Sequence, residues 1–208
     1  MATRKRITCY DSMIVRCEWP TNDPLLIEYH DKEWGMPLHD DRKLFEFLLL
    51  DAFQAGLSWS IILKKRETLR RAFSGFDPVK ISKYNNSKIE KLLKDPGIIR
   101  NRLKIESTIS NAKSFLSVQE EFGSFDRYIW GFVNDKPIIN HWKKISEIPA
   151  RTSLSDQISK DLIHRGFRFV GSTIIYAHLQ AIGIVNDHIV TCFRYKELCS
   201  EYKRNRKE

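Results

Sequence analysis

Residues Lys94–Arg102, with the sequence KDPGIIRNR, decide the fold because they place a tight turn between two helical segments. An amphipathic segment that opens near residue 86 stops at Asp95, and a long helical pattern runs from Ile98 to about Gln119. Proline cannot continue the first helix, and Gly97 permits both a sharp turn and the close approach of another backbone. The stretch therefore predicts a hairpin of two helices near residues 86–104.

Helical periodicity continues on both sides of this hairpin, and strand-like alternation is limited to short apolar runs. A helix is expected after a cap at Asp40 through the apolar run Leu44–Phe53, and another from Ser58 to about Phe73. Further helices are expected after Asp77-Pro78, over 125–133, from a capping box at Ser153 and Asp156 to Gly166, and over 171–182, with a loop at 134–152. The predicted class is all-α, a helical bundle in one domain.

The composition suits a globular chain with a core of its own. The 208 residues are 42% hydrophobic, which is enough for a sizeable core without disulfides. The formal net charge is +9, and basic residues gather at both ends, so 1–15 and 199–208 are expected to be basic flexible tails around a module at 16–198. This charge suits a polyanion such as nucleic acid, although a soluble protein with charged tails would look the same.

We expect neither a membrane-spanning segment nor an export signal in this sequence. No apolar run follows the basic N-terminal residues, and no segment reaches the length of a membrane span. The expected compartment is the reducing cytoplasm, where cysteines stay as thiols or metal ligands. We expect a monomer with no membrane partner.

Two Cys–His pairs lie at opposite ends of the chain: Cys17 with His30, and His188 with Cys192. Three intervening residues would put His188 and Cys192 one turn apart on a helix, facing the same way. Together the four side chains would form a thiolate–imidazole set that suits tetrahedral Zn²⁺ and leaves no open position for catalysis. Chance pairing among four Cys and six His is the alternative.

Asp51 stands in the most apolar helical segment of the N-terminal half. A buried carboxylate is costly without a partner, so this residue is either bound to the structure or held for a ligand. Trp59 follows about two turns later, and a carboxylate near a large aromatic suits a flat, cationic ligand. A cap or ion pair for Asp51 and core packing for Trp59 are the alternatives. Aromatic side chains that would stack on a base, or pack around a metal, cluster at Trp19, Tyr29 and Trp34.

The start of the second hairpin helix is a candidate contact for phosphate. Its free N–H groups would face outward and suit phosphate oxygens. Arg100, Arg102 and Lys104 add positive charge nearby. Phosphates carry no base identity, so such a contact would not depend on nucleotide sequence. An ordinary turn between helices is the alternative.

Seven motifs keep their order and spacing from about residue 16 to about 195. They are Arg16–Trp19 (RCEW), Tyr29–Gly35 (YHDKEWG), Gln54–Trp59 (QAGLSW), Leu63–Glu67 (LKKRE), Gly97–Arg100 (GIIR), Arg165–Gly171 (RGFRFVG) and Val185–His188 (VNDH). This series resembles the family of DNA-3-methyladenine glycosylase I, enzymes of base-excision repair. The resemblance covers all of the chain except the tails.

The resemblance implies an all-α fold of the helix-hairpin-helix glycosylase superfamily, acting on double-stranded DNA with alkylated bases. It implies a structural zinc ion that joins segments 17–30 and 186–192 through Cys17, His30, His188 and Cys192. The base pocket would be formed by the catalytic residues Asp51, Tyr29 and Trp59, with Trp19 and Trp34 close by. Leu57 and Gly56 would lie on a loop that wedges into the gap left by the extruded nucleotide. The DNA backbone would be held by hairpin residues Gly97, Ile98, Ile99, Arg100 and Arg102.

The implied reaction is a monofunctional, hydrolytic release of 3-methyladenine. The alkylated base carries positive charge and leaves neutral, so no strong general acid, covalent DNA intermediate or consumed cofactor is expected. The enzyme has to extrude the nucleotide, hold the base and admit water to the sugar. Asp51 would accept hydrogen bonds from the adenine edge, Trp59 would stack on the ring and Tyr29 would line the pocket.

The chain departs from the family at one site position. Residue 51 is usually Glu in the well-known bacterial members, whereas this chain has Asp51, whose carboxylate reaches less far by roughly 1.5 Å. A shifted helix or a bridging water would close that gap. The shorter side chain leaves room for an alternative function, a zinc-stabilised module that recognises alkylated bases without cleavage. A hydrolase with catalytic zinc is a second alternative, against which a complete Cys₂His₂ set argues.

Overall fold

The computed structural model describes residues 14–204 of the chain. The predicted basic tail at 1–15 lies almost wholly outside the described residues, as do Cys9 and 205–208. No helix within 14–204 is long and apolar enough to cross a membrane.

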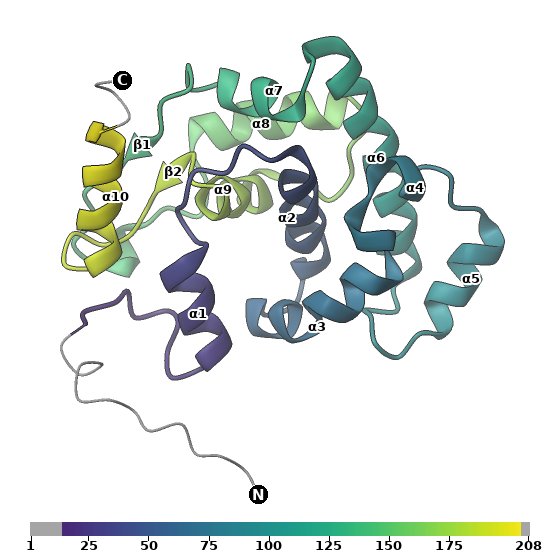
Figure 1. Cartoon of the computed structure of the whole chain (residues 1–208), viewed down its shortest axis with the longest axis horizontal. Coiled ribbons are helices and arrows are strands. Elements are labelled where there is room, and N and C mark those ends of the chain that lie inside the picture. The colour runs from purple at the N-terminus through teal and green to yellow at the C-terminus, as the bar shows by residue number, and fades with distance from the viewer. Residues whose placement is uncertain (1–13, 205–208) are drawn as a thin grey trace, which may run out of the picture.

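The described chain is mostly helical, as predicted, with one very short parallel ladder (Figure 1). The strands are β1 (Ile138–Ile139) and β2 (Val185–Asn186). Two 3₁₀ turns lie at Ser74–Phe76 and Ile145–Glu147. The α-helices are α1 (Pro24–Lys32), α2 (Asp41–Gln54), α3 (Trp59–Ala72), α4 (Pro78–Ile81), α5 (Asn86–Lys94), α6 (Arg102–Phe122), α7 (Phe125–Gly131), α8 (Ser153–His164), α9 (Ser172–Ala181) and α10 (Phe193–Arg204).

Helix α2 lies in the middle of the molecule, with α10 towards one side and α5 towards the other (Figure 1). All residues from Leu44 to Phe53 are buried, which is typical of a helix that other elements cover on every side. It packs against α3, α6, α7 and α9. The predicted caps are confirmed at both ends of this region: Asp40 accepts a hydrogen bond from the N–H of Lys43 at 2.8 Å, and Ser58 accepts one from the N–H of Ile61. The apolar core thus fixes the helix that carries Asp51.

Helices α5 and α6 follow the predicted order, with the turn at 95–101 between them. The second helix begins at Arg102 rather than at Ile98, because the Asn101 side chain caps it through the N–H of Lys104 at 3.1 Å. The turn is pinned to α3, whose Thr68 hydroxyl and Lys65 ammonium donate to the carbonyl of Gly97 at 2.6 and 3.2 Å.

Four further local predictions from the sequence are wrong. His188 and Cys192 do not lie on a helix; they lie in the loop that leaves β2, where pairing with β1 holds the chain extended. Residues 199–204 of the tail predicted at 199–208 belong to α10, which runs to Arg204, and Tyr202 is buried and donates to the carbonyl of Gly35. The predicted loop at 134–152 contains β1 and a 3₁₀ turn, and α8 is capped by Thr152 with Ser155 rather than by Ser153 with Asp156.

Gly183 sets how closely the N-terminal segment approaches the end of α9. Its φ is +74°, and a Cβ there would lie 2.3 Å from the carbonyl carbon of Met36. Gly183→Ala is therefore expected to lower the free energy of unfolding by at least about 3 kcal/mol, because neither backbone can yield cheaply. Urea unfolding measures this change. Gly131→Ala is the control: no atom lies within 4 Å of its added Cβ, so a change of no more than about 1 kcal/mol is expected. Equal effects at the two positions would contradict the close-approach argument.

Candidate functional site

A cavity of about 340 Å³ opens between α1, α2, α3 and α9. It collects all five side chains that the sequence predicted for a base pocket, together with five others. Its walls are Trp19, Tyr29, Trp34, Asp51, Gln54, Trp59, Ile145, Ile148, Ala177 and Gln180. A small concave site with aromatic walls and few polar groups is the usual form of a site for a flat organic ligand.

Asp51 is the buried acid of this cavity, with only 3% of its surface exposed. One carboxylate oxygen, Oδ2, lies 2.8 Å from Nδ1 of His178 on α9. The other, Oδ1, accepts no hydrogen bond from the chain within 14–204. Burial raises the pKa of Asp51, and the contact with His178 acts against that shift. One oxygen is therefore available for a ligand in the cavity.

The aromatic walls form one contiguous cluster. The rings of Tyr29 and Trp59 have centroids 5.2 Å apart, and those of Trp19 and Trp34 are 5.1 Å apart in an edge-to-face arrangement. Trp19 also meets Tyr29 at 6.1 Å. Burial, and then the charge of Asp51, raise the pKa of Tyr29 well above its ordinary value, so its hydroxyl stays protonated and can donate.

Sequence reasoning missed half of the cavity wall. Gln54 lines the cavity from the end of α2, and its place at the start of the QAGLSW motif does not by itself predict a pocket residue. Ala177 and Gln180 line the cavity from α9, whose apolar pattern indicated only burial. Ile145 and Ile148 come from the segment predicted as loop, and no pattern in the sequence places that segment beside α2.

A second hollow of about 250 Å³ shares Asp51, Gln54 and Ala177 with the cavity and continues towards Gly56 and Leu57. Leu57 is 37% exposed, which is high for a large apolar side chain. Gly56 has φ +77° and permits the turn that presents Leu57. Leu57, the predicted wedge residue, thus lies at the surface and lines the second hollow, which adjoins the cavity.

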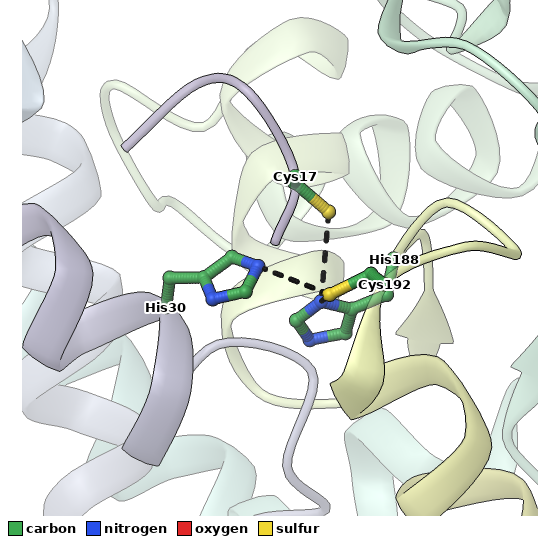
Figure 2. Close-up of side chains that lie close together, drawn as sticks. All are labelled: Cys17, His30, His188 and Cys192. Atoms are coloured by element: carbon green, nitrogen blue, oxygen red, sulfur yellow. Dashed lines mark hydrogen bonds between the residues drawn. The ribbon is translucent and has the colours of Figure 1, made fainter. Parts of the chain in front are cut away.

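Cys17, His30, His188 and Cys192 converge from the two ends of the chain (Figure 2). All four are buried, and their ligand atoms lie within 4.8 Å of one another. Cys192 Sγ is 3.5 Å from Nε2 of His30 and 3.5 Å from Nδ1 of His188, and Cys17 Sγ is 3.7 Å from the same Nδ1. Zinc bonds of typical length would separate a sulfur and a nitrogen of a tetrahedral set by roughly 3.6 Å. The residues fit a metal ion of that kind.

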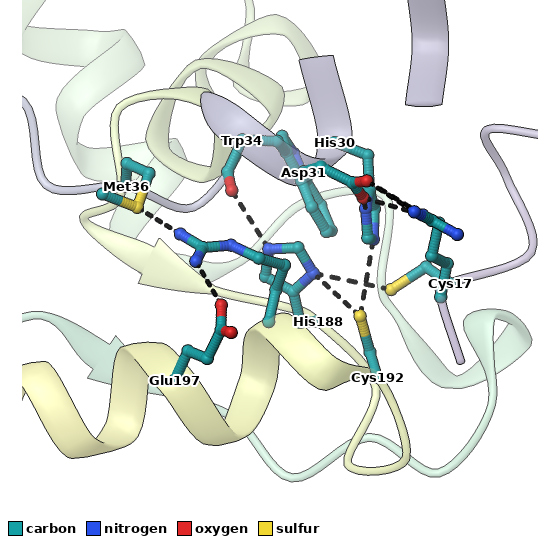
Figure 3. A network of polar contacts seen from close by, with 10 residues as sticks. Cys17, His30, Asp31, Trp34, Met36, His188, Cys192 and Glu197 are labelled. Carbon is teal, nitrogen blue, oxygen red and sulfur yellow. Dashed lines mark hydrogen bonds and ion pairs between the residues drawn. The ribbon is translucent and has the colours of Figure 1, made fainter. Parts of the chain in front are cut away.

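Both imidazoles are oriented by their far nitrogens (Figure 3). His188 Nε2 lies 3.0 Å from the carbonyl of Trp34, and His30 Nδ1 lies 2.8 Å from Asp31, which Arg16 holds through paired hydrogen bonds. A hydrogen on each far nitrogen leaves the near nitrogen free to bind a metal.

One of the two sulfurs, that of Cys192, carries the charge of a thiolate, and Cys17 keeps its proton beside it. Contact with Cys17, followed by the two imidazoles, lowers the pKa of Cys192. The same contact with Cys192, together with burial, raises the pKa of Cys17. The cluster also touches the cavity: Trp34 accepts from His188 and lines the cavity, and Tyr29 directly precedes His30.

The hairpin residues predicted to bind DNA differ in their surroundings. Arg100 is exposed and has no ion-pair partner within the described chain, and the N–H groups of Ile99 and Arg100 donate to none of its acceptors. Ile98 is buried, so its side chain belongs to the core. Arg102 pairs with Glu90 at 2.6 Å and lies 3.6 Å from Glu106.

Two further groups of the hairpin are engaged within the protein. The N–H of Gly97 donates to Asp95 at 2.7 Å. Lys104, expected to add charge for phosphate, is buried and donates to the carbonyls of Phe53 and Ala55 at 2.8 and 2.5 Å, so this expectation is wrong. The groups of the turn that stay without a partner in the described chain therefore include the N–H groups at 99–100 and the Arg100 side chain.

The sequence of this chain is similar to a family of known proteins and to individual enzymes. A family profile described as methyladenine glycosylase matches residues 19–195. DNA-3-methyladenine glycosylase 1 of Escherichia coli (strain K12) is 49% identical over 180 residues, covering 86% of this chain and 96% of that protein. DNA-3-methyladenine glycosylase of Haemophilus influenzae is 44% identical, covering 86% and 97%.

Solved structures agree in fold. A crystal structure of 3-methyladenine DNA glycosylase I superposes with a TM-score of 0.84 at 48% identity, covering 86% of this chain and 98% of that one. A variant of such an enzyme, solved in complex with 3-methyladenine, superposes with a TM-score of 0.83 at 35% identity, covering 86% and 96%. With a matching profile over most of its length and relatives at this identity, the chain belongs to the methyladenine glycosylase family.

Proposed function

We propose that this protein is a DNA repair glycosylase that extrudes and hydrolytically excises 3-methyladenine from double-stranded DNA. The observation that carries the proposal is the aromatic cavity of about 340 Å³ with the buried carboxylate of Asp51 in its wall, in a chain of this family. Relatives at 44–49% identity carry that activity in their names. The chain acts as a monofunctional enzyme and as a single copy.

The cavity supplies what a cationic purine needs. Trp59 lines the cavity and would stack on the ring, Trp34 adds an aromatic wall, and the protonated hydroxyl of Tyr29 offers a donor. The free Oδ1 of Asp51 accepts a hydrogen bond from the base edge and favours positive charge there. Because an N3-methylated adenine leaves as a neutral base, binding and extrusion carry most of the catalysis, and water completes the hydrolysis at the sugar.

Asp51→Asn tests the acid of this cavity. The amide keeps the size but removes the charge, so release of 3-methyladenine from methylated duplex DNA is expected to slow about tenfold to hundredfold. Chromatographic detection of the freed base measures the rate.

Asp51→Glu examines the alternative of a binding module that does not cleave. A wild-type protein that releases no base while an established glycosylase does would contradict the enzyme proposal. A large gain in release by Asp51→Glu would say that the natural carboxylate is too short for cleavage.

We further propose that the Cys17–His30–His188–Cys192 cluster binds one structural zinc ion. Two sulfurs and two imidazole nitrogens at tetrahedral spacing support it, as do the oriented far nitrogens of both histidines. The ion would clasp the N-terminal segment and α1 to the loop before α10. It would complete no chemical step, since all four positions are taken by protein.

Removal of this metal is expected to affect both stability and the cavity. At free zinc a thousand times its Kd, the bound ion contributes about 4 kcal/mol, which corresponds to roughly 8–16 °C in Tm for a chain of this size. Chelation should therefore lower Tm by that amount and weaken the binding of free 3-methyladenine, because Trp34 and Tyr29 adjoin the cluster.

Calorimetry and a fluorescence titration of the cavity tryptophans measure the two effects. Cys192→Ser should reproduce them, whereas Cys199→Ser, outside the cluster on α10, should not. An unchanged Tm after complete removal of bound metal would contradict the clasp.

We also propose that α5, the turn and α6 act as the helix-hairpin-helix element that holds the DNA backbone. The exposed Arg100 and the free N–H groups at 99–100 support a phosphate contact. Leu57, exposed beside the second hollow, would fill the space of the extruded nucleotide.

The hairpin proposal predicts different effects on DNA binding for Arg100 and Arg102. Arg100→Ala is expected to weaken duplex binding several-fold and to reduce the slope of log K against log salt by about 1, because a free charge is lost. Arg102→Ala should do less, since Glu90 and Glu106 already offset its charge. Fluorescence anisotropy over a salt series measures both variants. A larger salt effect for Arg102→Ala than for Arg100→Ala would contradict the assignment.

A further inference from the structure

His178 is a fully buried histidine that the proposed chemistry has not used. It lies on α9, and none of its side-chain surface is exposed. Its Nδ1 lies 2.8 Å from Oδ2 of Asp51, whereas its Nε2 has no hydrogen-bond partner within residues 14–204. A buried polar side chain with one bond and one unpaired nitrogen costs stability, so its presence in the core calls for a reason beyond packing.

The imidazole of His178 contacts Asp51 but does not itself line the cavity. Ala177 and Gln180 on the same helix form part of the cavity wall, but His178 does not. Its contact with Oδ2 engages the oxygen turned towards α9 and leaves Oδ1 for a ligand.

We infer that His178 is a positioning residue that donates from Nδ1 to Oδ2 of Asp51 and so holds the carboxylate ionised and aimed at a cationic base. This inference rests on the proposed function, because the base is the proposed substrate. The pair Asp51–His178 is the unit that reads the charge of the base. Neither residue does so alone.

Two physical arguments support this role. An Asp side chain in a helix has few ways to direct its carboxylate, and a hydrogen bond from a rigid ring selects one of them. Burial disfavours the ionised acid, and a hydrogen bond to the ionised form offsets that cost. The hydrogen bond and the charge of His178 are what act against the effect of burial on the pKa of Asp51. A packing role alone would need no donor at Nδ1.

Two amide variants separate positioning from packing. His178→Asn places an N–H donor near the position of Nδ1, whereas His178→Gln places it near Nε2, away from Asp51. His178→Leu removes the donor while filling similar space. The variants are compared in single-turnover release of 3-methyladenine from methylated duplex DNA, and in affinity for free 3-methyladenine. Binding to a duplex that holds an abasic-site analogue serves as the control, because no base enters the cavity there.

A positioning role for His178 predicts a distinct order of release rates and base affinities among the variants. His178→Leu and His178→Gln should slow release and weaken base affinity about tenfold to hundredfold, and His178→Asn should stay within about threefold of wild type. Binding of the abasic duplex should change less than twofold in all three. Asp51→Asn combined with His178→Leu should be no slower than Asp51→Asn alone, because residues that act as one unit are not additive.

Equal losses in His178→Asn and His178→Gln, wild-type rates in His178→Leu, or multiplying effects in the double variant would each overturn the inference. If His178→Leu fails to fold, the comparison of the two amide variants still decides. If the wild type binds free 3-methyladenine but releases none from DNA, the proposed activity fails while the affinity series still judges His178. If the wild type neither binds nor releases the base, both fall.

Discussion

The segment 34–38 is hydrogen-bonded along the end of α9, and both the cavity and the Cys/His cluster depend on that docking. The N–H of Gly35 donates to the carbonyl of Gln180 at 2.9 Å, and the N–H of Leu38 donates to that of Ile182 at 3.1 Å. Gly183 has no Cβ, so the backbone at Met36 comes within contact of it. Trp34 therefore enters the cavity wall while its carbonyl faces His188. One backbone contact thus aligns two sites made from opposite ends of the chain.

Asp187 and Asp51 are both buried, but they differ in how many hydrogen bonds their carboxylates accept. That difference separates a structural carboxylate from one that is available to a ligand. Asp187 accepts four hydrogen bonds, from Asn140, Trp142, Tyr176 and Gln180. Those bonds satisfy both of its oxygens, so it holds the loop that leads to His188 and has little capacity left for a ligand. Asp51 accepts a single bond from the described chain, from His178. A buried carboxylate with an unused oxygen beside a cavity is poised for a ligand that brings its own donor and charge.

Lys104 links the cavity helix to the hairpin. Its ammonium is buried and donates to carbonyls at the end of α2, just before the turn that presents Leu57. A buried cation without a carboxylate partner is stabilised there by the negative end of a helix. Burial lowers the pKa of Lys104. The contact ties α6, which follows the hairpin turn, to the start of the loop at 55–58, so the two predicted DNA contacts are joined through one buried side chain.

Local signals in the sequence determined the helices, their caps and the residue types of both sites. Asp40, Ser58 and Asp77 cap their own next turn, and the Pro-Gly pair at 96–97 ends α5, because these effects act within a few residues. The residue pattern, together with the family resemblance, also pointed to the five aromatic and acidic side chains that meet in the cavity and to the four that meet in the cluster. The chemistry of these side chains, acid, aromatic ring, thiol or imidazole, can be predicted from the sequence alone.

Only the tertiary structure decided where those residues lie and what else surrounds them. It placed His188 and Cys192 in a loop after β2, extended α10 through 199–204, and brought Ile145 and Ile148 to the cavity. It withdrew Lys104 from the surface and put His178 against Asp51, 127 positions away in the chain. The physical reason is that burial and long-range hydrogen bonds depend on which elements pack together, and no local pattern carries that information. The sequence by itself determined the acid at position 51; the partner that holds it came from the fold.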